Sequence, residues 1–314
     1  MKHSKEYLVL RSSDLAILFG TSEEELQEYC GSLIDSLDFR YRELSEGERD
    51  ALILSVLEKI DSKDLSSAGS ARKIDWEHGW QENLTAFVQS GFDLKMLLPK
   101  YYKKNVPVRL QRNYVMPISE DFVYNVTHVF RSWLFQRYFP AVDAVHEFGC
   151  GTAHHLAYLA SIYPQKKFYG YDWSTPSQEI IKLLAQHFGW DIKGFKFDFF
   201  CPSEDIVLGK NCGVLTFGAL EQTGADHDKY IDFLLKQAPE ICINVECLHE
   251  LYDTGYLPDY LALKYHRKRN YLSGYLTRLR ELVSHGKIEI IKVHHQQFGN
   301  IFDDSHSYVI WKPL

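Results

Sequence analysis

Two short segments hold the residues best suited to chemistry. Residues 145–153 read Val-His-Glu-Phe-Gly-Cys-Gly-Thr-Ala, and residues 169–172 read Tyr-Gly-Tyr-Asp. Glycines such as Gly149 and Gly151 let the backbone approach a ligand closely, and an acid such as Asp172 can accept ribose hydroxyl protons. An order of strand, glycine turn, helix and second strand would bring the two segments together. The pattern therefore indicates a ligand that contains a nucleoside.

The spacing of the glycines decides which kind of ligand fits. A dinucleotide fingerprint needs a third glycine three residues after the second, and His154 occupies that position. The remaining pattern is Glu147, two residues before Gly149, followed by Gly-x-Gly-Thr. It resembles motif I of the class I S-adenosylmethionine-dependent methyltransferases. Ala153 stands where that family often has a further glycine, a mild departure that narrows the turn.

Length and composition set limits on the protein class. The 314 residues are 45% hydrophobic and 14% aromatic, enough for a packed core, and the formal charge of −7 argues against coating nucleic acid or an anionic membrane. The six cysteines form no C-x-x-C pair, so we expect neither a disulfide framework nor a zinc site. We find no signal peptide and no apolar run long enough for a membrane span, and a reducing cytoplasm fits best.

Changes in composition divide the chain into three regions. Residues 1–73 are predicted to form a small helical region in which Ser45 and Glu48 form a capping box, and a polar linker lies at 61–71. Residues 74–140 are rich in aromatic residues and are predicted to form a helical cap or connector, with Arg109 or Arg112 as candidates to face a substrate. Residues 141–314 form the third region.

The third region alternates between strand and helix patterns. Strands are predicted near 143–147, 167–171, 193–197, 212–217 and 240–246, and helices near 152–163, 174–188, 226–237 and 257–284. This order predicts an α/β fold with a doubly wound, mostly parallel sheet. A closing pair at 286–293 and 307–311 resembles the methyltransferase sheet, whose last strand inserts antiparallel. The resemblance covers roughly residues 142–314.

Ligands of such sheets bind beyond the carboxyl ends of the strands. The resemblance implies S-adenosylmethionine as the cofactor. It also implies that Glu147 lies near the ammonium of the cofactor, that the glycine turn holds the methionine part, and that Asp172 binds the ribose. An acid and an apolar neighbour after the third strand would contact the adenine. The residues implied to bind the cofactor are Glu147, Gly149, Gly151, Asp172, Trp173, Asp198, Phe199 and Gly218. For Trp173, packing between helices is an equally good reading.

The fourth strand end reads Thr-Phe-Gly-Ala-Leu-Glu-Gln over residues 216–222. It lacks the Asp/Asn-Pro-Pro-Tyr sequence used by methyltransferases of amide or exocyclic amino nitrogens. It also lacks an aspartate suited to a catechol-type magnesium site, so we expect no metal. Glu221 and Gln222 would lie near the transferred methyl group, unless they simply begin a helix.

The fifth strand end has the densest acid and base cluster, with Glu246, His249 and Glu250. A hydroxyl acceptor needs a base, and the unperturbed pKa of histidine, about 6.5, suits that role. His249 is therefore the first candidate for the base, with Glu246 or Glu221 orienting it, although a histidine in a surface loop is an equally good interpretation. The candidates for binding the acceptor are Gln222, Glu250, Tyr252, Arg267, Arg269 and Tyr271, and the basic ones also fit a solvated helix face.

The leading hypothesis is an S-adenosylmethionine-dependent methyltransferase that acts on a small molecule, at a hydroxyl oxygen. The first alternative is a methyltransferase of nitrogen, in a small molecule or a protein side chain. The second is a non-methylating subunit that binds the cofactor and serves a partner. Nucleic acid as a substrate is disfavoured by the net charge, and a homodimer is one option for the oligomeric state.

Overall fold

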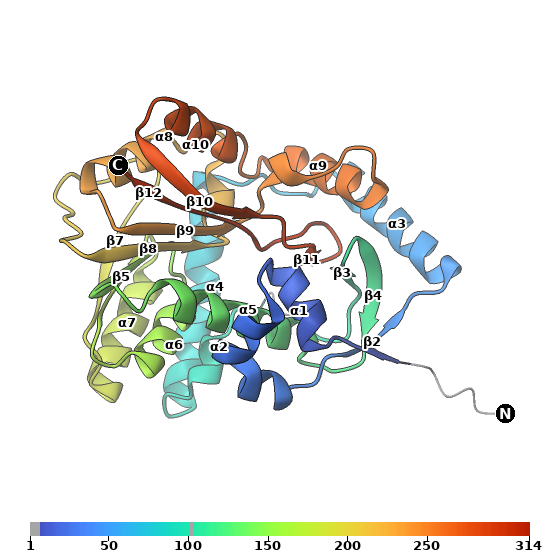
Figure 1. Cartoon of the computed structure of the whole chain (residues 1–314), viewed down its shortest axis with the longest axis horizontal. Coiled ribbons are helices and arrows are strands. Elements are labelled where there is room, and N and C mark those ends of the chain that lie inside the picture. The colour runs from blue at the N-terminus through green and yellow to red at the C-terminus, as the bar shows by residue number, and fades with distance from the viewer. Residues whose placement is uncertain (1–6, 101–102) are drawn as a thin grey trace.

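The computed structural model describes residues 7–100 and 103–314, and its largest element is a seven-stranded sheet (Figure 1). The strand order is β10-β12-β9-β8-β5-β6-β7. Strands β5 to β9 pair in parallel, whereas β12 runs antiparallel between β9 and β10. The strands span Ala144–Phe148 (β5), Lys167–Asp172 (β6), Ile192–Lys196 (β7), Cys212–Phe217 (β8), Ile241–Glu246 (β9), Ile288–His294 (β10) and Ser307–Pro313 (β12). The predicted α/β sheet with an antiparallel last strand is confirmed.

The central strands are buried because their sequences are almost continuously apolar. All residues of β5 and β8 are buried, as expected for parallel strands that helices cover on both faces. One face packs against α5 (Phe122–Tyr138), α6 (His154–Ile162) and α7 (Thr175–Phe188). The other face packs against α8 (Asp228–Gln237) and α10 (Tyr275–Ser284). Figure 1 shows α8 and α10 above the sheet and α5, α6 and α7 below it.

The single helix predicted near 257–284 is wrong. The chain forms α9 (Leu257–Arg269) and α10 instead, with a break between them. Asn270 ends α9 with a φ of 52°, and Gly274 precedes α10 with a φ of 78°. Both residues adopt the left-handed region, which stops a helix, and asparagine and glycine are the residue types that enter it most readily.

The N-terminal part contains a second sheet that the helical prediction missed. Its strands are all antiparallel, in the order β1-β2-β4-β3-β11. They are short and span Leu8–Val9 (β1), Arg40–Glu43 (β2), Val108–Leu110 (β3), Asn113–Pro117 (β4) and Phe298–Gly299 (β11). Strands of two to five residues show too little alternation for detection from sequence. The division at residues 73 and 140 stays a prediction.

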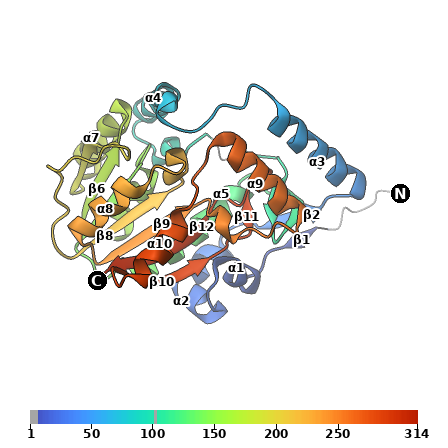
Figure 2. The same ribbon diagram turned by 90° about the horizontal axis from the view of Figure 1, so that it is seen from above.

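The remaining helices surround this smaller sheet and one end of the larger one. They are α1 (Ser12–Phe19), α2 (Glu23–Asp35), α3 (Glu46–Asp61) and α4 (Lys73–Gln89). The predicted capping box at the start of α3 is confirmed, since Ser45 and Glu48 exchange hydrogen bonds. Helix α4 begins after the predicted linker and packs beside α7 (Figure 2). Within residues 7–100 and 103–314, no helix is long and apolar enough to cross a membrane.

Candidate functional site

A pocket lies at the carboxyl ends of the parallel strands, where the motifs place the ligand. Residues from four strand ends line it, and six of them are sequence-predicted site residues: Gly149, Asp172, Trp173, Phe199, Gly218 and Gln222. The segments that supply them are distant in the sequence but adjacent in the sheet, since β8, β5, β6 and β7 are neighbours. The pocket therefore joins most of the predicted cofactor residues with one residue predicted to bind the acceptor.

The glycine turn after β5 depends on its two glycines. Gly149 has a φ of 73°, and a Cβ added there would lie 2.3 Å from the Cβ of Ala219. Gly151 has a φ of 52°, and its added Cβ would lie 2.9 Å from the ring of Trp80. Ala153 also adopts the left-handed region, with a φ of 57° at the start of α6. This conformation suits glycine better than alanine, which explains why a glycine is frequent there in the resembling family.

Asp172 holds the glycine turn from the neighbouring strand. Its Oδ2 accepts a hydrogen bond from the Gly151 N–H at 2.9 Å, and its Oδ1 accepts one from the Ser174 N–H at 2.9 Å. Burial raises the pKa of the Asp172 carboxyl, and these two N–H groups lower it in part. A carboxylate has about four acceptor positions, so Asp172 retains capacity for ribose hydroxyls.

Glu147 is the most unusual carboxylate of the site. It is buried at the end of β5, and its Oε2 has no hydrogen-bond partner among the described residues. Burial raises the pKa of this carboxyl well above its usual range, and the charge of Asp172 raises it further. Such an arrangement is costly without a ligand, because a buried carboxyl oxygen without a partner forgoes its hydration. This arrangement fits a residue whose free carboxyl oxygen binds a cationic group of a ligand.

Helix α4 supplies a further wall of the pocket, with two tryptophans that were not among the predicted site residues. Trp76 and Trp80 line the pocket, and their rings stack with centroids 5.2 Å apart. Lys73, one turn earlier, donates to Oδ2 of Asp198 at 2.7 Å. The signal for this wall in the sequence is the i, i+4 spacing of the two tryptophans, because this spacing puts both on one helix face.

At the other end of the edge, Glu246 is tied to the backbone. It is fully buried, and its carboxylate accepts hydrogen bonds from the N–H groups of Ala219, Leu220 and Glu221 at 3.2, 3.1 and 3.3 Å. Burial raises the pKa of Glu246 to about 7, against the lowering effect of these donors. Glu246 therefore braces the segment that follows β8 through the backbone N–H groups of that segment.

Glu221 and Gln222 lie on that braced segment. Gln222 lines the pocket and donates from Nε2 to Oε1 of Glu221 at 2.9 Å. Burial raises the pKa of Glu221 to about 8, and the charges of Asp303 and Glu246 add to the effect. A carboxyl that gains and loses its proton near neutral pH has the acid–base property that catalysis requires.

His249 and Glu250 contact α10 instead of the pocket. The ring of His249 hydrogen-bonds through Nδ1 to the carbonyl of Leu272 at 2.9 Å, and that ring is half-buried. Glu250 accepts the N–H groups of Leu276 at 3.0 Å and Thr277 at 3.4 Å, and so caps α10. The lining residues identified in the described chain include neither of them.

The other predicted acceptor residues lie around the end of α9. Tyr252 is buried and its hydroxyl accepts the Asp304 N–H at 3.0 Å. Arg267 is exposed, whereas Arg269 is buried and donates to the hydroxyl of Tyr271 at 3.0 Å. The roles of these residues stay predictions.

Arg109, a candidate to face substrate, is a buried structural cation. Only 1% of it is exposed, and it forms ion pairs with Asp259 and, at 3.0 Å, with Asp304. These aspartates come from α9 and from the segment before β12. The ion pairs fasten the N-terminal sheet to the C-terminal part of the chain.

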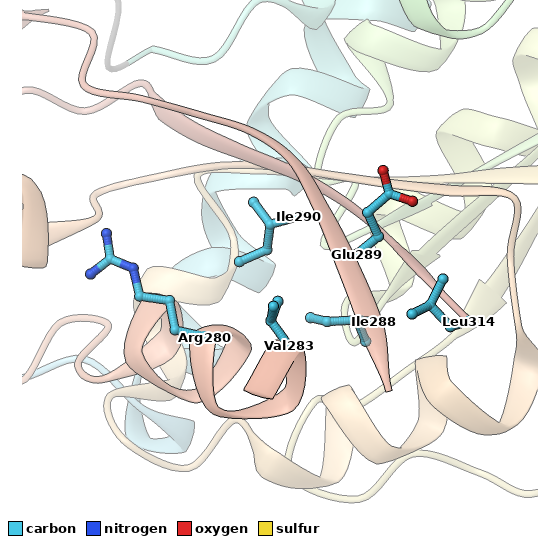
Figure 3. Close-up of a pocket in the computed structure, with 6 residues that line it drawn as sticks. All are labelled: Arg280, Val283, Ile288, Glu289, Ile290 and Leu314. Carbon is cyan, nitrogen blue, oxygen red and sulfur yellow. The ribbon is translucent and has the colours of Figure 1, made fainter. Parts of the chain in front are cut away.

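A second hollow, of about 430 Å³, lies at the outer edge of the sheet (Figure 3). Its walls come from α10, from β10 and from Leu314, as the labelled side chains of Figure 3 show. This edge is far along the sheet from the glycine turn, because β12, β9 and β8 separate β10 from β5. Among residues 7–100 and 103–314, no group of three or more His, Cys, Asp or Glu side chains could hold a metal ion.

Comparison with solved structures finds methyltransferases. No protein-family model matches the chain, and the search of curated proteins found no match. The magnesium protoporphyrin IX methyltransferase from Synechocystis PCC 6803 has a TM-score of 0.44 at 14% identity, over 73% of this chain and 96% of that one. Human N-acetylserotonin methyltransferase has a TM-score of 0.40 at 12% identity, over 93% and 70%. The 16S rRNA methylase ArmA has 0.40 at 16%, over 75% and 98%. At these scores the likenesses carry no argument about activity.

Proposed function

We propose that this protein is an S-adenosylmethionine-dependent methyltransferase of a small molecule. The observation that carries the proposal is the pocket at four adjacent strand ends, lined by the glycine turn and by the acid of the second strand. The resemblance to class I methyltransferases implies a role in cofactor binding for the same residues. The antiparallel place of β12 supports the same family of sheets.

The residues present fit this cofactor. The carboxyl oxygen of Glu147 is buried and has no partner in the described part of the chain, and it would receive the ammonium of the methionine part. The glycine turn leaves the space that a side chain would fill. Asp172 would bind the ribose, while Asp198 and Phe199 would contact the adenine. When bound, the cofactor supplies an electrophilic methyl group on a sulfonium, so the protein has to orient the acceptor and remove its proton.

A hydroxyl oxygen is the proposed acceptor, and Glu221 is now the first candidate for the base. Its raised pKa of about 8 makes its ionised form a stronger base than an ordinary carboxylate, and its partner Gln222 lines the pocket. Glu246 would position Glu221 through the backbone. His249, the first candidate from sequence, has its Nδ1 engaged by the Leu272 carbonyl. An amine acceptor would need less help from a base and is the alternative.

Calorimetry with S-adenosylhomocysteine tests the cofactor directly. We expect S-adenosylhomocysteine to bind to the full chain and NAD not to bind. We expect Glu147→Gln to weaken the binding of S-adenosylhomocysteine. Binding of NAD in place of S-adenosylhomocysteine would refute the proposal. A second experiment incubates the protein with methyl-labelled cofactor and a panel of hydroxylated and amine compounds, and mass spectrometry then identifies the methylated atom. Binding without transfer to any compound would favour the non-methylating subunit.

A further inference from the structure

The N-terminal half of α4 leaves little room in the proposed cofactor pocket. The cavity measures about 60 Å³, whereas sites for ligands of this size enclose roughly 300–1,000 Å³. Trp80 lies against Gly151 of the glycine turn, and Trp76 stacks on Trp80. The two indoles therefore fill space beside the turn that the methionine part of the cofactor would need.

The N-terminal half of α4 also contacts residues that were assigned to cofactor binding. Lys73 donates to Asp198 at 2.7 Å, and its ammonium lies 5.1 Å from the centre of the Trp173 ring. One turn further along α4, the carboxylate of Glu77 accepts the N–H of Thr175, at the start of α7, at 3.1 Å. Asp198 is a predicted adenine contact, and Trp173 is among the residues predicted to bind the cofactor. Lys73 thus competes with the adenine amino group for one carboxylate.

The two halves of α4 are held very differently. In the second half, Asn83 and Phe87 are buried, and the Asn83 amide donates to the carbonyl of Met96 at 2.7 Å. Residues 73–80, all of them described, include none that is fully buried. Their attachment to the pocket consists of the two indoles, the partly buried ion pair of Lys73 and the exposed contact of Glu77, and ion pairs near the surface contribute only about 0–1 kcal/mol each. The first half is therefore the weakly held part of the helix.

Two glycines bracket this half. Gly79 lies between the tryptophans, where an added Cβ would meet no described residue within 4 Å, and a glycine inside a helix lowers its stability by about 1 kcal/mol. Gly69, just before the helix, has a φ of 125°, which residues with side chains rarely adopt. The preceding Ala68 is anchored, because its N–H donates to the carbonyl of Arg269 at 2.6 Å. Residues 70–79 are therefore flanked at each end by a glycine at which the backbone can change direction.

We propose that residues 73–80 form a lid which occludes the pocket, and that the helix has to unwind around Gly79 before the cofactor enters. This inference rests on the proposed function, since the cofactor is the ligand that displaces the lid. Entry exchanges the contact between Lys73 and Asp198 for a contact with the adenine, and moves Trp80 off Gly151. Association is then limited by lid opening and not by diffusion.

Stopped-flow tryptophan fluorescence with S-adenosylhomocysteine measures the association rate. Lys73→Met removes the ion pair but keeps the apolar stem, and we expect association about two- to fivefold faster, given the strength of an exposed pair. Gly79→Ala stiffens the helix without filling the pocket, and we expect association about fivefold slower, from about 1 kcal/mol of added helix stability. Unchanged rates in both variants would overturn the lid.

A cross-link gives a second test that does not depend on rates. Glu77→Cys and Thr175→Cys, in a Cys201→Ser background that removes the exposed cysteine, place two thiols across the contact between α4 and α7. After bridging with a short bifunctional thiol reagent, verified by intact mass, we expect binding of S-adenosylhomocysteine to be lost in calorimetry. The unbridged variant is the control and should bind. Full binding by the bridged protein would overturn the lid, whereas absence of binding to the wild type would overturn the proposed function instead.

Discussion

Glu147 at the end of β5 and Glu246 at the end of β9 are both buried carboxylates, but they are used in opposite ways. Glu147 has an oxygen without a partner among the described residues, whereas Glu246 accepts three backbone N–H groups. The first arrangement raises the free energy of the protein when no ligand is bound, and the second stabilises the fold. A carboxylate at a strand end is therefore a candidate ligand-binding group only if its acceptor positions are left open.

The largest effect is expected at Glu246. Glu246→Ala leaves two buried N–H groups and one partly buried N–H group without their acceptor. We expect a loss of about 2–6 kcal/mol in the free energy of unfolding, from about 1–3 kcal/mol for each of the two buried groups. Denaturant titration measures this loss. Glu250→Ala is the matched control, because it removes a helix cap at α10 and should cost only about 1 kcal/mol. Equal losses of stability in the two variants would show that Glu246 stabilises the fold no more than a helix cap does.

Glu147→Gln should have the opposite signature. We expect at least about tenfold weaker binding of S-adenosylhomocysteine, since a charge-assisted contact to the ammonium contributes about 1.5–3 kcal/mol. We also expect the variant to gain stability relative to the wild type as the pH rises above 4.5, because the buried carboxyl releases its proton on unfolding and the amide does not. Calorimetry and thermal unfolding on the same samples measure both effects. A variant that loses stability and retains its affinity would show that Glu147 stabilises the fold and does not bind the ligand.

Glu221→Gln tests the acid–base assignment through pH. The pKa of Glu221 is about 8 in the fold, above the ordinary value of 4.5, so the native state holds a proton that the unfolded chain releases. Its effect on stability is absent below pH 4.5 and destabilising as the pH rises towards 8. Because solvent screens this half-buried group in part, we expect the variant to gain about 1–2 kcal/mol at pH 8 relative to pH 5. A gain that does not change between these pH values would contradict the raised pKa.

The smallest effect is expected at His249. An asparagine side chain can donate to the Leu272 carbonyl as the ring does, so His249→Asn should change the affinity for S-adenosylhomocysteine by less than about twofold and stability by no more than about 1 kcal/mol. Once an acceptor is known, the rate of methyl transfer against pH is the decisive measurement. A loss of the rate by two orders of magnitude would restore His249 as the base.

The position of the glycine turn beside Asp172 could be predicted from the sequence because these residues belong to one local unit. Glu147, Gly149 and Gly151 lie within five residues, and Asp172 follows after one helix and one strand, so their places depend on the βαβ unit alone. The sheet was predictable for the same reason. The prediction that Asp172 binds a ligand is compatible with its contacts, although the hydrogen bond from Gly151 adds a structural role that no pattern contains.

The remaining parts depend on contacts between distant segments. Trp76 and Trp80 reach the pocket because α4 packs on α7, about a hundred residues later in the chain, and no local periodicity encodes that choice. The short strands of the second sheet are too brief for a periodic signal. Glu246 and Glu250 were strong candidates by position, and the donors that engage them are backbone groups, which composition does not reveal.

The pairing of β11 with β3 has a consequence for the synthesis of the chain. Phe298 and Gly299 complete the sheet that begins at Leu8, and the ion pairs of buried Arg109 need Asp259 and Asp304. The first third of the chain leaves the ribosome without its last strand and with this cation unpaired. We therefore expect the N-terminal region to reach its final structure only after almost the whole chain has been translated, so that its folding is one of the last events and not the first.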